Sequence, residues 1–205
     1  MDAVPIQENK DDKIYYLLKV AVIFLIGALV VAFLLEPTPT VLSNLGAVPP
    51  FSLVDSRGSK MSLDQLKGKV WVADFMYVHC TTQCPLMTAA MAKLQKAWLG
   101  KGVYFVSFTM DPSDTPQELA KYAKQYGADT DSWAFLTGKY EDVTRLAQYG
   151  FKLPAQGGPD SDFIHSIRFT LVDKQGKIRG YYNSDDEGSL NQLNRDLWVL
   201  LAEKS

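Results

Sequence analysis

The sequence is poor in the residues that form covalent cross-links or bind soft metal ions. It has 205 residues but only two cysteines and two histidines. Two cysteines are too few for a disulfide scaffold. Because the net charge is -2 and no basic block is present, the chain also lacks the basic patch of a nucleic-acid-binding protein. Both cysteines stand in one short run, Cys80 and Cys84, with three residues between them. They are therefore expected to act together.

Charged side chains are missing from residues 20–35. Extended back across Lys19 to Ile14, this apolar stretch is long enough, at about 1.5 Å per residue, to cross a hydrocarbon core of about 30 Å. A cleaved signal peptide is the alternative, but the sequence that follows does not resemble a small-x-small cleavage site. We therefore predict a cytoplasmic segment at residues 1–13 and a single transmembrane helix at residues 14–35.

Basic residues are distributed unevenly around this stretch. Lys10, Lys13 and Lys19 lie at its N-terminal side, and the next basic residue is Arg57. Because cytoplasmic flanks carry an excess of lysine and arginine, the N-terminus is predicted to be cytoplasmic. The N-terminal segment is not the Arg-rich, acid-poor sequence of a mitochondrial transit peptide. The expected location is the bacterial inner (cytoplasmic) membrane, with the rest of the chain in the periplasm or on another extracytoplasmic face, where thiols tend to be oxidised.

Proline is concentrated directly after the predicted membrane helix. Pro37, Pro39 and Pro49 lie within residues 36–49, which are predicted to form an extended tether. No internal repeat or low-complexity segment follows. Residues 50–205 are therefore predicted to form one domain outside the cytoplasm.

The predicted domain alternates between strands and helices. Strands are expected at residues 51–54, 70–77, 103–109 and 134–136, with a hairpin at 167–172 and 178–182. A one-turn helix is expected at residues 62–65, and longer helices from Pro85 to Gly100, from Thr115 to Gly127, up to Gly150, and across residues 190–201. Strands that alternate with helices imply a parallel sheet. A closing antiparallel hairpin followed by a helix makes the predicted α/β fold thioredoxin-like.

The two cysteines lie between the predicted central strand and a helix. Exposed N–H groups at a helix N-terminus favour a thiolate, so the pair can form a disulfide or hold one soft metal ion. Two thiolates and one imidazole suit Cu(I), and Cu(II) accepts the same set. The ring of His79 is expected to point away from the Cys80 sulfur, whereas a thioredoxin-like fold would bring the loop of His165 close to the cysteines. Spacing alone leaves His165 as either a ligand or a surface residue.

Several segments together resemble the Sco/SenC family, whose members are membrane-anchored, thioredoxin-like proteins that help to load copper into cytochrome c oxidase. The segments are residues 75–88 (FMYVHCTTQCPLMT), 107–112 (SFTMDP), 114–116 (DTP), 135–138 (FLTG) and 162–166 (DFIHS). The resemblance covers about residues 50–201. It implies that Cys80, Cys84 and His165 bind copper. It also implies that the copper is delivered to the Cu-A centre in subunit II of cytochrome c oxidase.

Two positions depart from the family's pattern. Thr81 stands where many members have a proline directly after the first cysteine, and only Ser113 separates the Asp-Pro segment from the next aspartate. The first change is expected to alter the stiffness of the loop more than the binding of metal. The second leaves two roles open for Asp111, either next to the metal ligands or in shaping a strand-to-helix turn.

Methionine thioethers also bind Cu(I), which makes Met87 and Met91 alternative ligands. Both residues repeat at helical spacing with Leu94 and Trp98. This periodicity predicts that the two methionines belong to the hydrophobic core.

The predicted function is that of a membrane-anchored copper chaperone. The alternative is a thiol-disulfide oxidoreductase that keeps the copper-site cysteines of the oxidase reduced. A third possibility is a peroxidase, since the scaffold resembles peroxiredoxins, but the motif does not supply their usual peroxide site. The expected partners are subunit II of the oxidase, a periplasmic copper donor and a thiol reductant, with no nucleic acid. Because the same two sulfurs serve copper transfer and thiol reduction, the sequence does not separate the two main functions.

Overall fold

The structure is a computed structural model that describes residues 10–34, 41–153 and 167–203, with side chains in the first helix described for residues 15–28. The chain divides into two compact units, Met1–Thr40 and Val41–Ser205. In the first unit, the described residues form the helix α1 (Lys10–Leu34).

The predicted membrane anchor falls in this first unit. Within the described residues, no helix has both the length and the apolar character needed to cross a membrane. The predicted span at residues 14–35 ends at Leu35, which lies outside the described residues. The anchor therefore stays a prediction.

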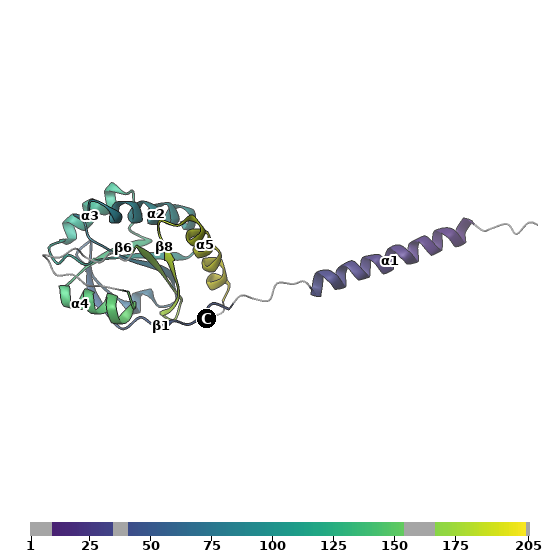
Figure 1. Cartoon of the computed structure of the whole chain (residues 1–205), viewed down its shortest axis with the longest axis horizontal. Helices are drawn as coiled ribbons and strands as arrows, with labels where there is room; N and C mark the ends of the chain where they lie inside the picture. Colours follow the sequence, from purple (N-terminus) through teal and green to yellow (C-terminus); the bar gives the residue numbers. More distant parts are fainter. Residues whose placement is uncertain (1–9, 35–40, 154–166, 204–205) are drawn as a thin grey trace, which may run out of the picture. The chain divides into compact units, whose positions relative to one another are not determined.

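The second unit is a mixed α/β domain built on one sheet (Figure 1). Its strands are β1 (Gly46–Ala47), β2 (Ser52–Asp55), β3 (Lys60–Ser62), β4 (Val70–Met76), β5 (Val103–Thr109), β6 (Trp133–Thr137), β7 (Arg168–Val172) and β8 (Lys177–Asn183). Its helices are η1 (Leu63–Leu66), α2 (Gln83–Trp98), α3 (Pro116–Gln125), α4 (Tyr140–Arg145), η2 (Leu146–Gly150) and α5 (Glu187–Ala202). In Figure 1, α2, α3 and α5 cover one face of the sheet and α4 covers the other.

The centre of the sheet is arranged as the sequence predicts, whereas the short strands β1 and β3 were not expected. The strand order is β1-β8-β7-β4-β5-β6-β2-β3. The central strands β4, β5 and β6 are parallel, whereas β7 pairs antiparallel with β4 and β8 antiparallel with β7. A parallel centre closed by an antiparallel hairpin and a helix is consistent with a thioredoxin-like fold. The carboxyl end of β4, which is buried along its whole length, is thus fixed in the middle of the sheet.

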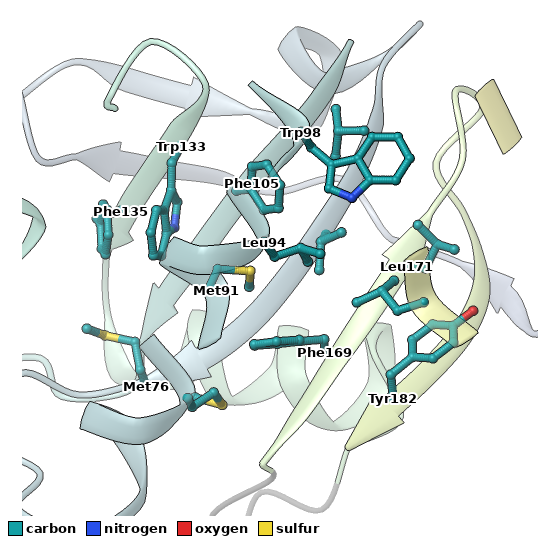
Figure 2. Close-up of a cluster of buried hydrophobic side chains, with 14 of the residues drawn as sticks. Met76, Met91, Leu94, Trp98, Phe105, Trp133, Phe135, Phe169, Leu171 and Tyr182 are labelled. Atoms are coloured by element: carbon teal, nitrogen blue, oxygen red, sulfur yellow. The ribbon is translucent and has the colours of Figure 1, made fainter. Parts of the chain in front are cut away.

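Apolar side chains fill the space between the sheet and the helices on each face. Figure 2 shows the cluster on the α2 side, in which Met91 and Trp98 of α2 lie with Phe105 and Phe169 of the sheet. Met87 belongs to the same cluster and is also buried. The prediction that both methionines are core residues is confirmed. Because α2 is held by this packing, the loop that precedes it has a fixed end point.

The domain begins earlier than residue 50. Gly46 pairs with Ile178 across β1 and β8, and Val48 is buried. The guanidinium of Arg179 donates hydrogen bonds to the backbone carbonyl of Leu42 at 2.8 Å and to a carboxylate oxygen of Glu203 at 2.8 Å. Part of the segment predicted as a tether is therefore an edge strand of the sheet, and the compact unit starts at Val41. A two-residue strand is too short to produce a hydrophobic alternation in the sequence.

Three local elements also differ from the prediction. The helix α2 starts at Gln83, so that Pro85 occupies its third position. The helix predicted to end at Gly150 is α4 continued by a π-helical turn. The expected one-turn helix is a 3-10 helix, and its capping box is present because the Ser62 N–H donates to Gln65 Oε1 at 2.6 Å. None of these differences moves the cysteines away from the end of β4.

Candidate functional site

The cysteines lie where the central strand gives way to a helix. Cys80 is in the loop after β4, and Cys84 is in the first turn of α2. Both are free thiols, and both side chains are buried, with exposed fractions of 7% and 3%. The Cys80 N–H donates to the Tyr77 carbonyl at 3.3 Å, which closes a tight turn directly before the helix. The loop therefore presents the two sulfurs at the helix N-terminus, as the sequence predicts.

Cys80 has the environment of a reactive thiol. Burial alone would raise its pKa, but the thiolate is stabilised by hydrogen bonds that outweigh this effect and lower the pKa to about 7. The Cys84 N–H donates to Cys80 Sγ at 3.3 Å, and the Cys84 thiol, the Thr82 backbone and Tyr77 also contribute. A substantial fraction of Cys80 is therefore ionised at neutral pH.

Cys84 has the opposite character. Burial raises its pKa, and so do the hydrogen bond with Cys80 and the negative charges of Cys80 and Asp74, whereas the Tyr77 backbone lowers it only in part. Cys84 therefore keeps its proton until a cation or a covalent partner takes the sulfur. The pair combines one thiolate and one thiol within hydrogen-bonding range, which suits both the capture of a soft metal ion and the formation of a disulfide.

Of the two histidines, His79 is the one that lies among the described residues. His79 is two-thirds exposed, and its Nε2 lies 3.9 Å from Glu118 Oε1 on α3. The predicted third ligand, His165, lies outside the described residues. Within the residues described, no group of three histidine, cysteine, aspartate or glutamate side chains is placed to hold a metal ion.

Two aspartates follow β5, Asp111 and Asp114, and they have different roles. The sequence had left the role of Asp111 open. Asp111 Oδ1 accepts hydrogen bonds from the backbone N–H of Ser113 at 2.8 Å and from its hydroxyl at 2.7 Å. This arrangement shapes the turn, as one of the two interpretations expected. Asp114 is the residue that reaches the cysteine loop, because its Oδ2 accepts from the Val78 N–H at 2.9 Å and from the Thr109 hydroxyl. Asp114 is a positioning residue that the sequence analysis missed.

Asp74 was also missed. It lies within β4 and is completely buried, and neither carboxylate oxygen makes a hydrogen bond of good geometry with a described residue. Burial raises its pKa to about 7, and the Ser107 hydroxyl on the neighbouring strand lowers it only in part. Its charge raises the pKa of Cys84. An aspartate inside an otherwise apolar strand was the signal in the sequence that could have identified it.

Comparison with known proteins places these features in a family. The sequence model described as SCO1/SenC matches residues 42–197, which include both cysteines and the segment of His165. The SCO1 protein homolog of Bacillus subtilis is 36% identical over 155 residues, which cover 73% of this chain and 80% of that protein.

Solved structures show the same fold. BsSco, a member of the Sco family of cytochrome c oxidase assembly proteins in which a disulfide switch was identified, is 32% identical with a TM-score of 0.72, covering 80% of this chain and 100% of that one. ScoI of Bradyrhizobium japonicum with copper bound is 23% identical with a TM-score of 0.62, covering 75% of this chain and 99% of that one. The second likeness concerns the fold alone.

Proposed function

The chain belongs to the SCO1/SenC family, and on this premise we propose that it is a copper chaperone in the assembly of cytochrome c oxidase. Cys80, Cys84 and His165 bind one copper ion, Cu(I) or Cu(II), and deliver it to the Cu-A centre in subunit II. The observation that carries this proposal is the pair of free, buried thiols of unequal acidity at the start of α2. The likeness to BsSco, from a family of oxidase assembly proteins, supports the choice of partner.

The unequal thiols determine how the ion is taken up. Cys80, with a pKa of about 7, offers a thiolate at neutral pH, whereas Cys84 has to release its proton when it becomes a ligand. Copper uptake therefore releases protons, most of them from Cys84. The apolar cluster that holds α2 limits the access of water to the sulfurs. Transfer then proceeds by ligand exchange, in which thiolates of the target replace those of the carrier one at a time.

A second function, thiol-disulfide exchange, is favoured by the same two pKa directions. The Cys80 thiolate attacks a disulfide of the target, forms a mixed disulfide and releases one target thiolate. Cys84 then loses its proton and displaces the second target sulfur, which leaves a reduced target and a Cys80–Cys84 disulfide. A separate thiol reductant has to restore the pair. The disulfide switch of BsSco supports this alternative.

The two functions can be separated by what restores oxidase activity when the protein is absent. If copper delivery is the task, a deletion strain should lose cytochrome c oxidase activity, and added copper should restore part of it. A His165→Ala strain should resemble the deletion although both cysteines remain, because a copper carrier needs its third ligand. Oxidase activity in cell membranes is the measurement. A His165→Ala strain with normal activity, together with rescue by a small-molecule thiol reductant instead of copper, would favour thiol reduction.

The proposal includes the predicted location, with residues 14–35 as a single anchor in the bacterial inner membrane. The supporting observations are the uncharged residues 20–35 and the lysines on their N-terminal side. A copper donor and a thiol reductant in the periplasm would then act on the same domain. A reporter that is active only in the periplasm, fused after Ser205, should be active, and one that is active only in the cytoplasm should not. The reverse pattern would contradict this topology.

A further inference from the structure

A pocket opens beside Cys80, between the cysteine loop and α3. Its cavity volume is about 440 Å³, which lies within the range of ligand-binding pockets. The loop contributes His79 and Cys80, and α3 and its C-terminal end contribute Glu118, Lys121, Gln125 and Tyr126. We call this cavity the Cys80 pocket, because Cys84 is not among the described residues that line it. A molecule in the Cys80 pocket therefore contacts Cys80 before it can contact Cys84.

The floor of the Cys80 pocket is aromatic. The rings of Tyr122 and Tyr126 lie with their centroids 4.8 Å apart at an angle of 45°. Tyr122 is held in place because its hydroxyl is 2.8 Å from the Thr88 hydroxyl of α2, within the buried core. One fixed aromatic ring beside a second, with polar groups around them, suits a short, extended segment of polypeptide, because the rings contact side chains and the rim contacts the backbone.

The rim of the Cys80 pocket carries one carboxylate, that of Glu118, and one ammonium group, that of Lys121. Glu118 Oε2 accepts hydrogen bonds from the Thr115 N–H at 2.8 Å and hydroxyl at 3.0 Å, and its other oxygen faces His79. Its negative charge is thus satisfied at the start of α3. Lys121 is exposed, and no ion pair within 4.0 Å joins it to another side chain in the described part of the chain. The charge of Lys121 acts on Glu118 at longer range, but its ammonium group has no close ion pair among the described side chains and is placed to form one with a partner.

We propose that the Cys80 pocket binds an extended segment of the copper acceptor, with a thiol directed at Cys80 and a neighbouring acidic side chain at Lys121. This inference rests on the proposed function. In the exchange, the acceptor thiol loses its proton to solvent and forms a bond to Cu(I), the bond from copper to Cys80 breaks, and the freed Cys80 sulfur leaves as a thiolate that exchanges protons with solvent. Copper remains Cu(I) throughout, and Cys84 holds the ion during the step. Lys121 is a positioning residue for the acceptor and does not bind metal.

The test uses full-length protein loaded with one Cu(I) and two synthetic dithiol peptides. One peptide carries an aspartate next to its first cysteine, and the other carries a lysine there. Lys121→Glu should slow transfer to the aspartate peptide about tenfold and speed transfer to the lysine peptide, because the rim charge sets the rate of association. Transfer to dithiothreitol, which is too small to use the rim, should not change. Stopped-flow measurement of copper transfer gives all three rates.

Lys124→Glu is the matched control, since Lys124 is exposed on the same helix but does not line the Cys80 pocket. It makes the same change in net charge and should leave all three rates near those of the wild type. Equal rates for Lys121→Glu and Lys124→Glu with both peptides would overturn the assignment of the pocket. A wild-type protein that transfers copper to dithiothreitol but shows no preference between the peptides would also overturn it, while leaving the proposed function intact. No transfer to any acceptor would refute both.

Discussion

Replacing Cys84 with serine should abolish tight copper binding. The substitution removes one of two soft sulfur ligands and leaves a hydroxyl, which binds Cu(I) poorly. Because changes in residues that merely support a metal ligand cost about 10-fold to 100-fold in affinity, loss of a ligand should cost more than about 100-fold. Cys80→Ser should have an effect of the same order. The measurement is competition for Cu(I) between the reduced protein and a coloured chelator.

The control for these variants is Thr81→Ala, which alters an exposed residue between the two cysteines and keeps both sulfurs. Its copper affinity should remain close to that of the wild type. Thermal unfolding of each copper-free variant shows whether the fold is intact, which matters because both cysteines are buried. One-to-one binding of undiminished affinity by folded Cys84→Ser would remove Cys84 from the site.

The same experiment can be carried out on the oxidised wild type. A Cys80–Cys84 disulfide has no thiolate to offer, so oxidation should mimic the double loss of ligands, and reduction should restore binding. The two proposed functions therefore exclude each other in time, since a chain that has just reduced a target cannot carry copper until its own disulfide is reduced.

The central part of the fold could be predicted because its signals are local. A β-branched, apolar run gives β4, and the helical spacing of Met87, Met91 and Trp98 gives α2, so the position of the cysteines between the two elements follows from the sequence. The edge strand β1 could not be predicted in this way. It depends on pairing with β8, more than a hundred residues away, and on the contact of Arg179 with Leu42.

The same distinction applies to the site. A thiolate was expected at the cysteine pair from its place before a helix, whereas the contrast between Cys80 and Cys84 depends on burial, on the contact between the two sulfurs and, to a lesser extent, on Asp74, which no spacing rule reveals. The Cys80 pocket unites residues of the cysteine loop with Lys121 and Glu118 of α3, and only the packed structure brings these segments together. The ligand role of His165 rests on the family resemblance, since that residue lies outside the described ones.

Asp74 should make the domain less stable as the pH rises from about 4 to 7. Its pKa is raised from 3.8 to about 7 by burial in the folded state, so the folded protein holds this proton over a range where the unfolded chain has released it. Stability that depends on such a group is complete below the unfolded pKa and is lost as the pH rises through the folded pKa. At about 1.4 kcal/mol per pH unit, the loss over this window is about 4 kcal/mol.

Asp74→Asn should remove this pH dependence, because the amide does not ionise. The free energy of unfolding of the copper-free, reduced protein is measured in urea between pH 4 and pH 7, below the range in which most of Cys80 ionises. Relative to the wild type, the variant should gain up to about 4 kcal/mol across the window, even if its buried amide makes it less stable than the wild type at pH 4. Asp64→Asn makes the same change in formal charge at an exposed position and serves as the control. Curves for Asp74→Asn and the wild type that remain parallel throughout would show that Asp74 is already ionised at pH 4 in the folded protein, and that its carboxylate has a partner that compensates its burial.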